Sequence, residues 1–236
     1  MVNEKKTRSL FDERSIKLQV NNKDKSKAIQ KILNKTYPKV PIPLNYKNTF
    51  TLLISVLLSA QCTDVNVNNV TKNIYPKYNH PKHFVKLGRK RIERLIKRIG
   101  IFRVKAKSIY YLSKTLVEKY NNKVPNTYQE LEQLPGVGHK TASVVMSQGF
   151  GYPAFPVDTH IHRLAQRWGL TNGRNVVQTE KDLKEVFPKK NWNRLHLQII
   201  WYGREYCKAR DCFGLTCKIC KNCYPNRKTK FIAKKA

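Results

Sequence analysis

The tract LPGVGHK at residues 134–140 is the feature that most restricts how this chain can fold. A helix before it must stop at Pro135 and Gly136, because proline cannot continue the backbone hydrogen-bond ladder and glycine can adopt positive φ. A second helix then begins near Lys140. The tract therefore predicts a helix-hairpin-helix in which Gly136 and Gly138 leave no side chain between the backbone and a ligand.

Such a hairpin can hold a phosphate group. The backbone amides near Val137 and Gly138 would lie at the positive end of the second helix, where an anion is stabilised. An ordinary turn between two helices has the same Pro-Gly-x-Gly spacing. The tract alone therefore leaves DNA binding and a plain connection equally open.

Two candidate catalytic side chains accompany the hairpin. Lys140 stands where a gripped nucleotide would present its sugar carbon, and a lysine attacks as the neutral amine once its pKa falls from about 10.4. Asp158 precedes an expected helix that runs through Trp168, so it can cap that helix and also meet the positive charge left by a departing base. The plain alternatives are a lysine that only neutralises phosphate and an aspartate that only caps.

Five tracts in one order resemble the endonuclease III family of bifunctional DNA glycosylases and apurinic/apyrimidinic lyases. They are LLSAQCTD at 57–64, IGIF at 99–102, the hairpin, VDTHI at 157–161 and YGREYC at 202–207. The resemblance implies that Lys140 is the Schiff-base nucleophile and Asp158 the acid that assists base departure. It also implies that Gln61 and Ile101 enter the DNA stack and that His160 lies near Asp158, against the DNA backbone.

The two inserted side chains suit that task. A base that swings out of a duplex leaves a gap, which an apolar wedge such as Ile101 can fill while the amide of Gln61 bonds the partner base. Without the resemblance, the simpler interpretations are a core isoleucine beside Phe102 and a polar residue at a helix end.

Helical periodicity dominates the chain, and strand signals are scarce. Apolar residues recur at three-to-four spacing over 28–36, 50–62, 65–74, 80–87, 89–99, 104–119, 128–134 and 140–150. We therefore predict an all-α protein. The resemblance implies a six-helix barrel domain at 44–152 and a second helical domain at 153–225, with a C-terminal metal-cluster loop; the N-terminal helix and linker, 28–43, pack on the second domain. We expect a flexible basic tail at 1–27 and another basic tail at 226–236.

A net charge of +32 on 236 residues favours a polyanionic partner, and double-stranded DNA with damaged bases or abasic sites is the partner expected. An AT-rich genome produces the same lysine-rich bias, so charge supports this expectation without deciding it. No secretory signal is visible, and the longest apolar run, 50–60, falls short of the roughly 20 residues that a membrane helix needs. We expect an intracellular monomer without membrane association. It would be cytoplasmic or nucleoid-associated, or lie in the nucleus or a DNA-containing organelle if the host is eukaryotic.

Five of the six cysteines lie in one short tract, which in an intracellular chain indicates metal ligation rather than disulfides. The resemblance implies a [4Fe-4S] cluster, although four thiolates also suit zinc. The tract departs from the family spacing C-x6-C-x2-C-x5-C. The favoured ligand set is Cys207, Cys217, Cys220 and Cys223 with Cys212 spare; the alternative set takes Cys212 and leaves Cys207 out, which makes zinc more credible.

Together these features predict a bifunctional DNA glycosylase of base excision repair. It removes oxidised pyrimidines and cuts the strand 3′ to the abasic site by β-elimination; the base preference rests on the resemblance alone. One alternative is an adenine mismatch glycosylase. Lys140 and the short C-terminus argue against it. A noncatalytic helix-hairpin-helix DNA-binding protein is the other.

Overall fold

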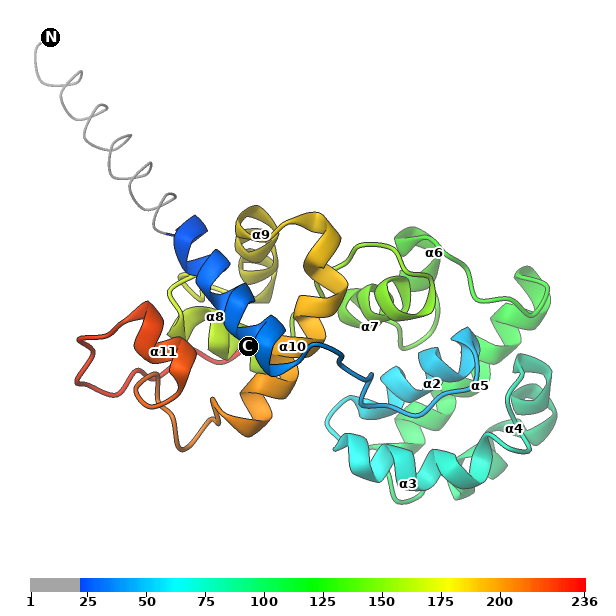
Figure 1. Ribbon diagram of the computed structural model, residues 1–236. Coiled ribbons are helices and arrows are strands. Elements are labelled where there is room, and N and C mark those ends of the chain that lie inside the picture. Colours follow the sequence, from blue (N-terminus) through cyan, green and yellow to red (C-terminus); the bar gives the residue numbers. More distant parts are fainter. Residues whose placement is uncertain (1–21) are drawn as a thin grey trace, which may run out of the picture. The chain divides into compact units, whose positions relative to one another are not determined.

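The computed structural model describes residues 22–236, and that part of the chain is helical without any strand (Figure 1). The prediction of an all-α protein is confirmed. The chain divides into two compact units. One runs from Pro41 to Pro156, and the other joins the residues up to Val40 with Val157–Ala236. Within the described residues, no helix is both long and apolar enough to cross a membrane.

The unit from Pro41 to Pro156 contains six α-helices, and the last one continues as a π-helical turn, η1 (Val145–Gly149). They are α2 (Thr49–Ser59), α3 (Asp64–Ile74), α4 (Pro81–Leu95), α5 (Phe102–Lys119), α6 (Tyr128–Glu132) and α7 (His139–Val144). The central element is α2, because its residues from Phe50 to Leu58 are all buried and it packs against α3, α5 and α7. The expected apolar run at 50–62 therefore forms the core of this unit.

Local sequence explains where these helices begin and bend. Asn48 caps α2. Its side-chain oxygen accepts from the backbone N–H of Thr51 at 2.9 Å, and the Thr51 hydroxyl accepts from the backbone N–H of Asn48 at 2.9 Å. Gly88 interrupts the helical backbone inside α4 with a φ of 68°. This break falls between the two helical patterns that the sequence predicts at 80–87 and 89–99.

The other unit is built from the helix of residues 22–36 and the later helices of the chain. These are α8 (Thr159–Arg167), α9 (Val176–Val186), α10 (Trp192–Glu205) and α11 (Lys218–Cys223), with the 3-10 turn η2 (Lys189–Asn191) before α10. The N-terminal helix packs on α10, because the Gln198 amide donates to the carbonyl oxygens of Leu33 at 3.4 Å and Tyr37 at 2.9 Å.

Both expected tails differ from the structure where it describes them. Residues 22–27 are helical and continue into the N-terminal helix, whereas 1–21 lie outside the described residues. The C-terminal segment is docked rather than loose: the Lys234 amide donates to Gln166 Oε1 at 2.9 Å, and the Phe231 amide donates to the Phe213 carbonyl at 2.8 Å. Composition suggested a flexible N-terminal tail and a basic C-terminal tail, but it does not reveal such pairings.

Candidate functional site

The hairpin forms the turn between α6 and α7. Gly136 adopts a φ of +80°, and a Cβ on it would lie 2.7 Å from the Cβ of Ser108 in α5. Glycine is therefore needed there for the backbone conformation and for the close approach. Val137 is buried, and its amide donates to the Leu134 carbonyl at 3.0 Å. Val137 thus anchors the turn, and its amide is already used, contrary to the expectation that it faces a phosphate.

The N-terminus of α7 is open to an anion. Its N-cap is Gly138, which has an extended backbone and supplies no side-chain hydrogen bond to the first amides of the helix. Nothing lies within 4 Å of the position that a Cβ on Gly138 would occupy. Amides at a helix start that lack a side-chain acceptor are suited to receive a phosphate oxygen.

His139 ties the start of α7 to α6. Its ring stacks on Tyr128 with centroids 5.5 Å apart, and its Nδ1 lies 2.8 Å from Glu132 Oε1. These contacts hold the hairpin closed from the solvent side. This role of His139 was not predicted from the sequence, where the only signal was a histidine beside the last glycine of the motif.

Lys140 is the second residue of α7, and its side chain is exposed. Among the described residues it forms no ion pair with a carboxylate. An amine in this position can be approached by a substrate that the hairpin holds by its phosphate.

Gln61 and Ile101 both have left-handed backbones, with φ of 53° and 49°. Ile101 is 53% exposed, so its interpretation as a core residue is wrong. A β-branched residue in this region is strained, at a cost of about 1–3 kcal/mol. An exposed apolar side chain on a strained turn is typical of a functional position rather than of one selected for stability.

The turns that carry these two side chains are in contact. A Cβ on Gly100 would lie 3.4 Å from the Gln61 carbonyl oxygen. The side-chain amide of Asn66 joins the two turns, because its Nδ2 donates to Cys62 Sγ at 3.2 Å and to the Arg98 carbonyl at 2.9 Å. The structure therefore presents Gln61 and Ile101 from one continuous surface of this unit.

A buried lysine forms hydrogen bonds to the backbone beside the turn of Gln61. Lys105 is 3% exposed, and its Nζ donates to the carbonyl oxygens of Leu58 at 2.8 Å and Ala60 at 2.5 Å, at the end of α2. Burial lowers the pKa of Lys105 from its ordinary value. Neither Lys105 nor Asn66 was predicted from the sequence to support the site. The available signal for Lys105 was its place between Phe102 and Ile109 at the spacing of a buried helix face.

Asp158 belongs to the other compact unit. It is the N-cap of α8, and its Oδ1 accepts from the Ile161 amide at 2.8 Å, so the predicted capping role is confirmed. His160 follows on the first turn of α8. Its ring packs on Gly203 of α10, since a Cβ on that glycine would lie 3.1 Å from the His160 Nδ1.

The loop between α10 and α11 gathers four thiols. The Sγ atoms of Cys207, Cys212, Cys217 and Cys220 all lie within 4.8 Å of one another, and all four residues are buried. Hydrogen bonding to the Cys207 thiol lowers the pKa of the Cys217 thiol. Four thiolates this close repel one another strongly in a buried site unless a cation lies among them. The donor set therefore fits a metal centre with four sulfur ligands.

This group differs from both ligand sets considered from the sequence, because it contains Cys207 and Cys212 together and leaves out Cys223. Cys223 is the last residue of α11, one turn beyond Cys220, whereas Cys217 caps the start of that helix. Burial raises the pKa of the Cys223 thiol to about 11, with Lys25 and Arg227 among its charged neighbours. Position along α11, which cysteine spacing does not reveal, separates Cys223 from the others.

Two arginines of α8 hold the cysteine loop in place. Arg167 is 2% exposed and donates to Cys207 Sγ at 3.4 Å and to the carbonyls of Lys208 at 2.8 Å and Ala209 at 2.9 Å. Arg163 donates to the carbonyl of Cys207 at 3.1 Å. The helix that Asp158 caps is therefore rigidly connected to the four-thiol group.

Comparison with known proteins identifies relatives along most of the chain. Residues 54–189 match the family described as HhH-GPD superfamily base excision DNA repair protein. Endonuclease III of Rickettsia prowazekii (strain Madrid E) is 42% identical over 192 residues, which cover 81% of this chain and 89% of that protein. Endonuclease III of Escherichia coli (strain K12) is 42% identical over 189 residues, covering 80% of this chain and 90% of the relative.

Solved structures agree with the sequence relatives. A non-covalent endonuclease III–DNA complex is 40% identical with a TM-score of 0.80, covering 84% of this chain and 92% of that one. A trapped endonuclease III–DNA covalent intermediate, an estranged-adenine complex, is 39% identical with a TM-score of 0.77, covering 84% and 97%.

The helical fold and the glycine hairpin define a helix-hairpin-helix DNA repair protein. The chain belongs to the HhH-GPD superfamily and, within it, to the endonuclease III family, which confirms the resemblance seen in the sequence. It is a base excision repair enzyme, a DNA glycosylase with apurinic/apyrimidinic lyase activity.

Proposed function

We propose that this enzyme removes oxidised pyrimidines from double-stranded DNA, with Lys140 as nucleophile and Asp158 as the assisting carboxylate. The observation that carries the proposal is Lys140 itself, an exposed lysine without a carboxylate partner among the described residues, on the first turn behind a glycine-capped hairpin. An amine nucleophile makes a lyase step possible.

Substrate binding in this proposal begins at the hairpin. A phosphate oxygen binds at the start of α7, beside Gly138, and the damaged nucleotide leaves the duplex so that its sugar reaches an active-site group. Ile101 and Gln61 fill the gap that remains in the stack, the first by apolar contact and the second by hydrogen bonds to the partner base. Their shared surface and left-handed backbones support this assignment.

The chemistry then follows from an amine. The neutral Lys140 Nζ forms a bond to C1′ of the sugar as the glycosidic bond breaks and the base leaves with its electron pair. The Asp158 carboxylate stabilises the positive charge that develops on the sugar and accepts a proton from the attacking amine. Ring opening yields an imine, loss of the C2′ proton expels the 3′ phosphate, and water then hydrolyses the imine and frees the lysine.

We assign a [4Fe-4S] cluster to Cys207, Cys212, Cys217 and Cys220, with zinc as the alternative metal. Such a cluster can exchange single electrons, but cleavage by an amine needs none, so its role here is structural. Bound metal would hold the loop from 207 to 220 in one conformation and present its exposed cations, Lys208 and Arg210, to DNA phosphates. The enzyme would act as an intracellular monomer on nucleoid DNA.

The ligand assignment is tested by paired serine variants. Cys212→Ser should lower the iron and sulfide content and the visible absorbance of the purified protein, whereas Cys223→Ser should leave both near the wild-type level. Loss of iron in Cys223→Ser with retention in Cys212→Ser would overturn the assignment. Zinc in place of iron in the wild-type protein would establish the alternative metal.

The catalytic assignment is tested by trapping with borohydride. Wild-type protein and Lys140→Gln are incubated with a duplex that carries one abasic site, and the covalent adduct is measured; Lys119→Gln, an exposed lysine of the same unit, is the matched control. We expect adducts for the wild type and the control and none for Lys140→Gln, with duplex binding within about threefold. Normal cutting by Lys140→Gln would refute the nucleophile.

The same assay separates the alternatives. A wild-type protein that excises adenine from mismatches without a trapped adduct would be a mismatch glycosylase. Tight binding without excision or adduct would indicate a noncatalytic DNA-binding protein. Release of oxidised pyrimidines from duplexes that contain a single lesion tests the base preference directly.

A further inference from the structure

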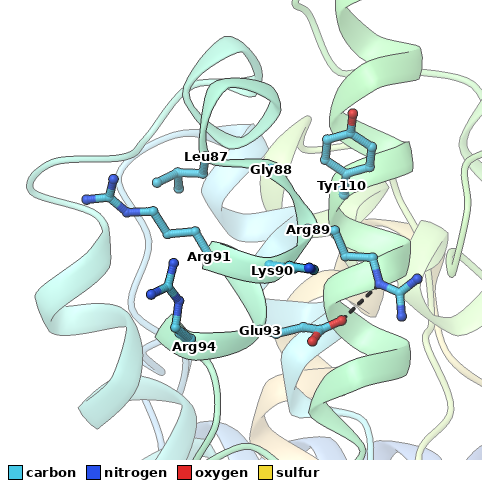
Figure 2. Close-up of a pocket in the computed structure, with 8 residues that line it drawn as sticks. All are labelled: Leu87, Gly88, Arg89, Lys90, Arg91, Glu93, Arg94 and Tyr110. Carbon is cyan, nitrogen blue, oxygen red and sulfur yellow. Dashed lines mark hydrogen bonds and ion pairs between the residues drawn. The ribbon is translucent and has the colours of Figure 1, made fainter.

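A basic hollow lies on α4, where Gly88 interrupts the helix (Figure 2). Its volume is about 690 Å³, and Tyr110 of α5 forms part of its wall. Four cations from one stretch of α4 line it: Arg89, Lys90, Arg91 and Arg94. The proposed catalytic mechanism uses none of these residues.

The hollow exists because α4 changes direction. Gly88 has a φ of +68°, and a Cβ placed on it would meet nothing within 4 Å. The positive φ separates the arm that ends at Leu87 from the arm that begins at Arg89, and both residues line the hollow. The space is therefore open to solvent at the break.

Most of the charge in the hollow is uncompensated. Its one carboxylate, Glu93, is paired with Arg89 Nε at 2.9 Å. Among the described residues, Lys90, Arg91 and Arg94 form no ion pair, and all three are exposed. Figure 2 shows Arg91 and Arg94 on the same side of α4, away from the Arg89–Glu93 pair. Arg91 and Arg94 therefore face solvent on the same side of α4.

The charge continues from the hollow toward Ile101. Lys97 and Arg98 are exposed in the turn that follows α4, and this turn leads into Gly100 and Ile101. At about 1.5 Å per residue, the helical part from Lys90 to Leu95 spans roughly 7.5 Å, and Lys97 and Arg98 extend the charge beyond the end of α4. One DNA strand carries a phosphate about every 3.4 Å of helix axis, so this surface is long enough to lie beside more than one phosphate.

We propose that this surface, defined by Lys90, Arg91, Arg94, Lys97 and Arg98 and called the α4 track, binds backbone phosphates of the duplex that flanks the lesion. The inference rests on the proposed function in taking DNA as the partner. It adds a second phosphate contact, because α4 and α7 lie on different sides of α2 and α5 (Figure 1). The α4 track would extend the footprint away from the hairpin and carry no base specificity.

An extended polyanion suits this surface better than a small anion does. A site for a single phosphate needs donors that converge in an enclosed space, whereas these side chains are exposed and distributed along the helix and the following turn. Flexible exposed cations that follow a line instead match the regular charge of a nucleic acid backbone. An acidic protein surface is the other macromolecule that such charge could attract.

The test is the salt dependence of binding to undamaged duplex DNA. Dissociation constants are measured by fluorescence anisotropy between about 50 and 200 mM salt for the wild type and for the double variant Arg91→Gln/Arg94→Gln. Each lost phosphate contact lowers the slope of log K against log salt by about 0.9, so we expect a decrease of about 1.8. The matched control is Lys72→Gln/Lys77→Gln, which removes two exposed charges from the same unit outside the α4 track.

A decrease confined to Arg91→Gln/Arg94→Gln, with unchanged melting temperature, would support the α4 track. Equal slopes for the two double variants would overturn it and leave an ordinary solvated face or a contact for an acidic protein. A second arm compares duplexes of about 10 and 30 base pairs, and the difference between the variants should appear only on the longer one. Failure of the proposed function would show separately, as absence of a wild-type adduct on abasic DNA.

Discussion

Gly136 in the hairpin and Ile101 in the turn before α5, called the wedge turn, both have a left-handed backbone, with φ of 80° and 49°. At Gly136 the chain uses the one residue that adopts this conformation without strain, and it packs that turn tightly against Ser108. At Ile101 it uses a residue that the conformation disfavours and leaves the side chain exposed. The hairpin therefore depends on the conformation of its backbone, whereas the wedge turn depends on the side chain that it exposes.

The largest effect expected from this comparison is loss of stability in Gly136→Ala. The added Cβ would lie 2.7 Å from Ser108 Cβ on a backbone that alanine disfavours, so the free energy of unfolding should fall by about 3 kcal/mol. The change in the free energy of unfolding is measured by urea denaturation. Gly138→Ala is the control, because nothing lies within 4 Å of its Cβ position and its φ is negative, so its stability should change by less than about 0.5 kcal/mol. Equal losses would show that the two glycines are not distinguished by packing.

A smaller loss is expected from Lys105→Met. The Leu58 and Ala60 carbonyls would lose the donor that joins α5 to the end of α2 beside Gln61, which should lower the free energy of unfolding by about 2 kcal/mol and weaken binding to abasic-site DNA. Lys107→Met, an exposed lysine of the same helix, should change neither. A stable variant with normal affinity for abasic DNA would show that Lys105 does not support the turn of Gln61.

The same lysine predicts a pH dependence. Burial lowers the pKa of Lys105 in the folded protein below its ordinary value of 10.5, so the unfolded chain binds more protons between those two pKa values. The stability of the wild type relative to Lys105→Met should therefore rise as pH increases toward 10.5 and fall as pH drops from there to the folded pKa. Unfolding at a series of pH values measures the difference. A difference independent of pH would contradict the lowered pKa.

The smallest change in stability concerns Ile101, where two substitutions separate backbone from side chain. Ile101→Gly should be about 1 kcal/mol more stable than Ile101→Ala, because only glycine relieves the left-handed strain. Both should bind abasic-site duplex roughly tenfold more weakly than the wild type, since each removes the wedge. Wild-type affinity in either variant would show that Ile101 is not a wedge.

Local rules predicted much of the fold and part of the candidate site. The hairpin, the break at Gly88 and the cap at Asp158 all depend on residues within about one helical turn, so they were visible in the sequence. The exposure of Ile101 was not visible, because an isoleucine beside Phe102 has the pattern of a core residue. The family resemblance, rather than periodicity, identified it.

The cysteine loop shows the same limit. Spacing indicated a metal centre but selected Cys223, because close spacing alone could not show which thiols converge. The structure groups Cys212 with the other three, since Cys217 and Cys220 occupy the first turn of α11 and Cys223 lies one turn beyond. The residue at which α11 begins determines which cysteine thiols lie close together.

By itself, the sequence determined where the helices stop, which positions need glycine, how much positive charge the chain carries and that one short tract supplies enough thiols for a metal centre. These properties depend on composition or on neighbours a few residues apart. Only the tertiary structure decided that Lys105 is buried beside the turn of Gln61, that Asn66 joins the turns of Gln61 and Ile101, and that the cations of the α4 track form no ion pair within the described part of the chain. Such contacts join residues that are far apart in the sequence; Ala60 and Lys105, for example, are separated by 45 positions. Packing alone determines which of these distant residues meet.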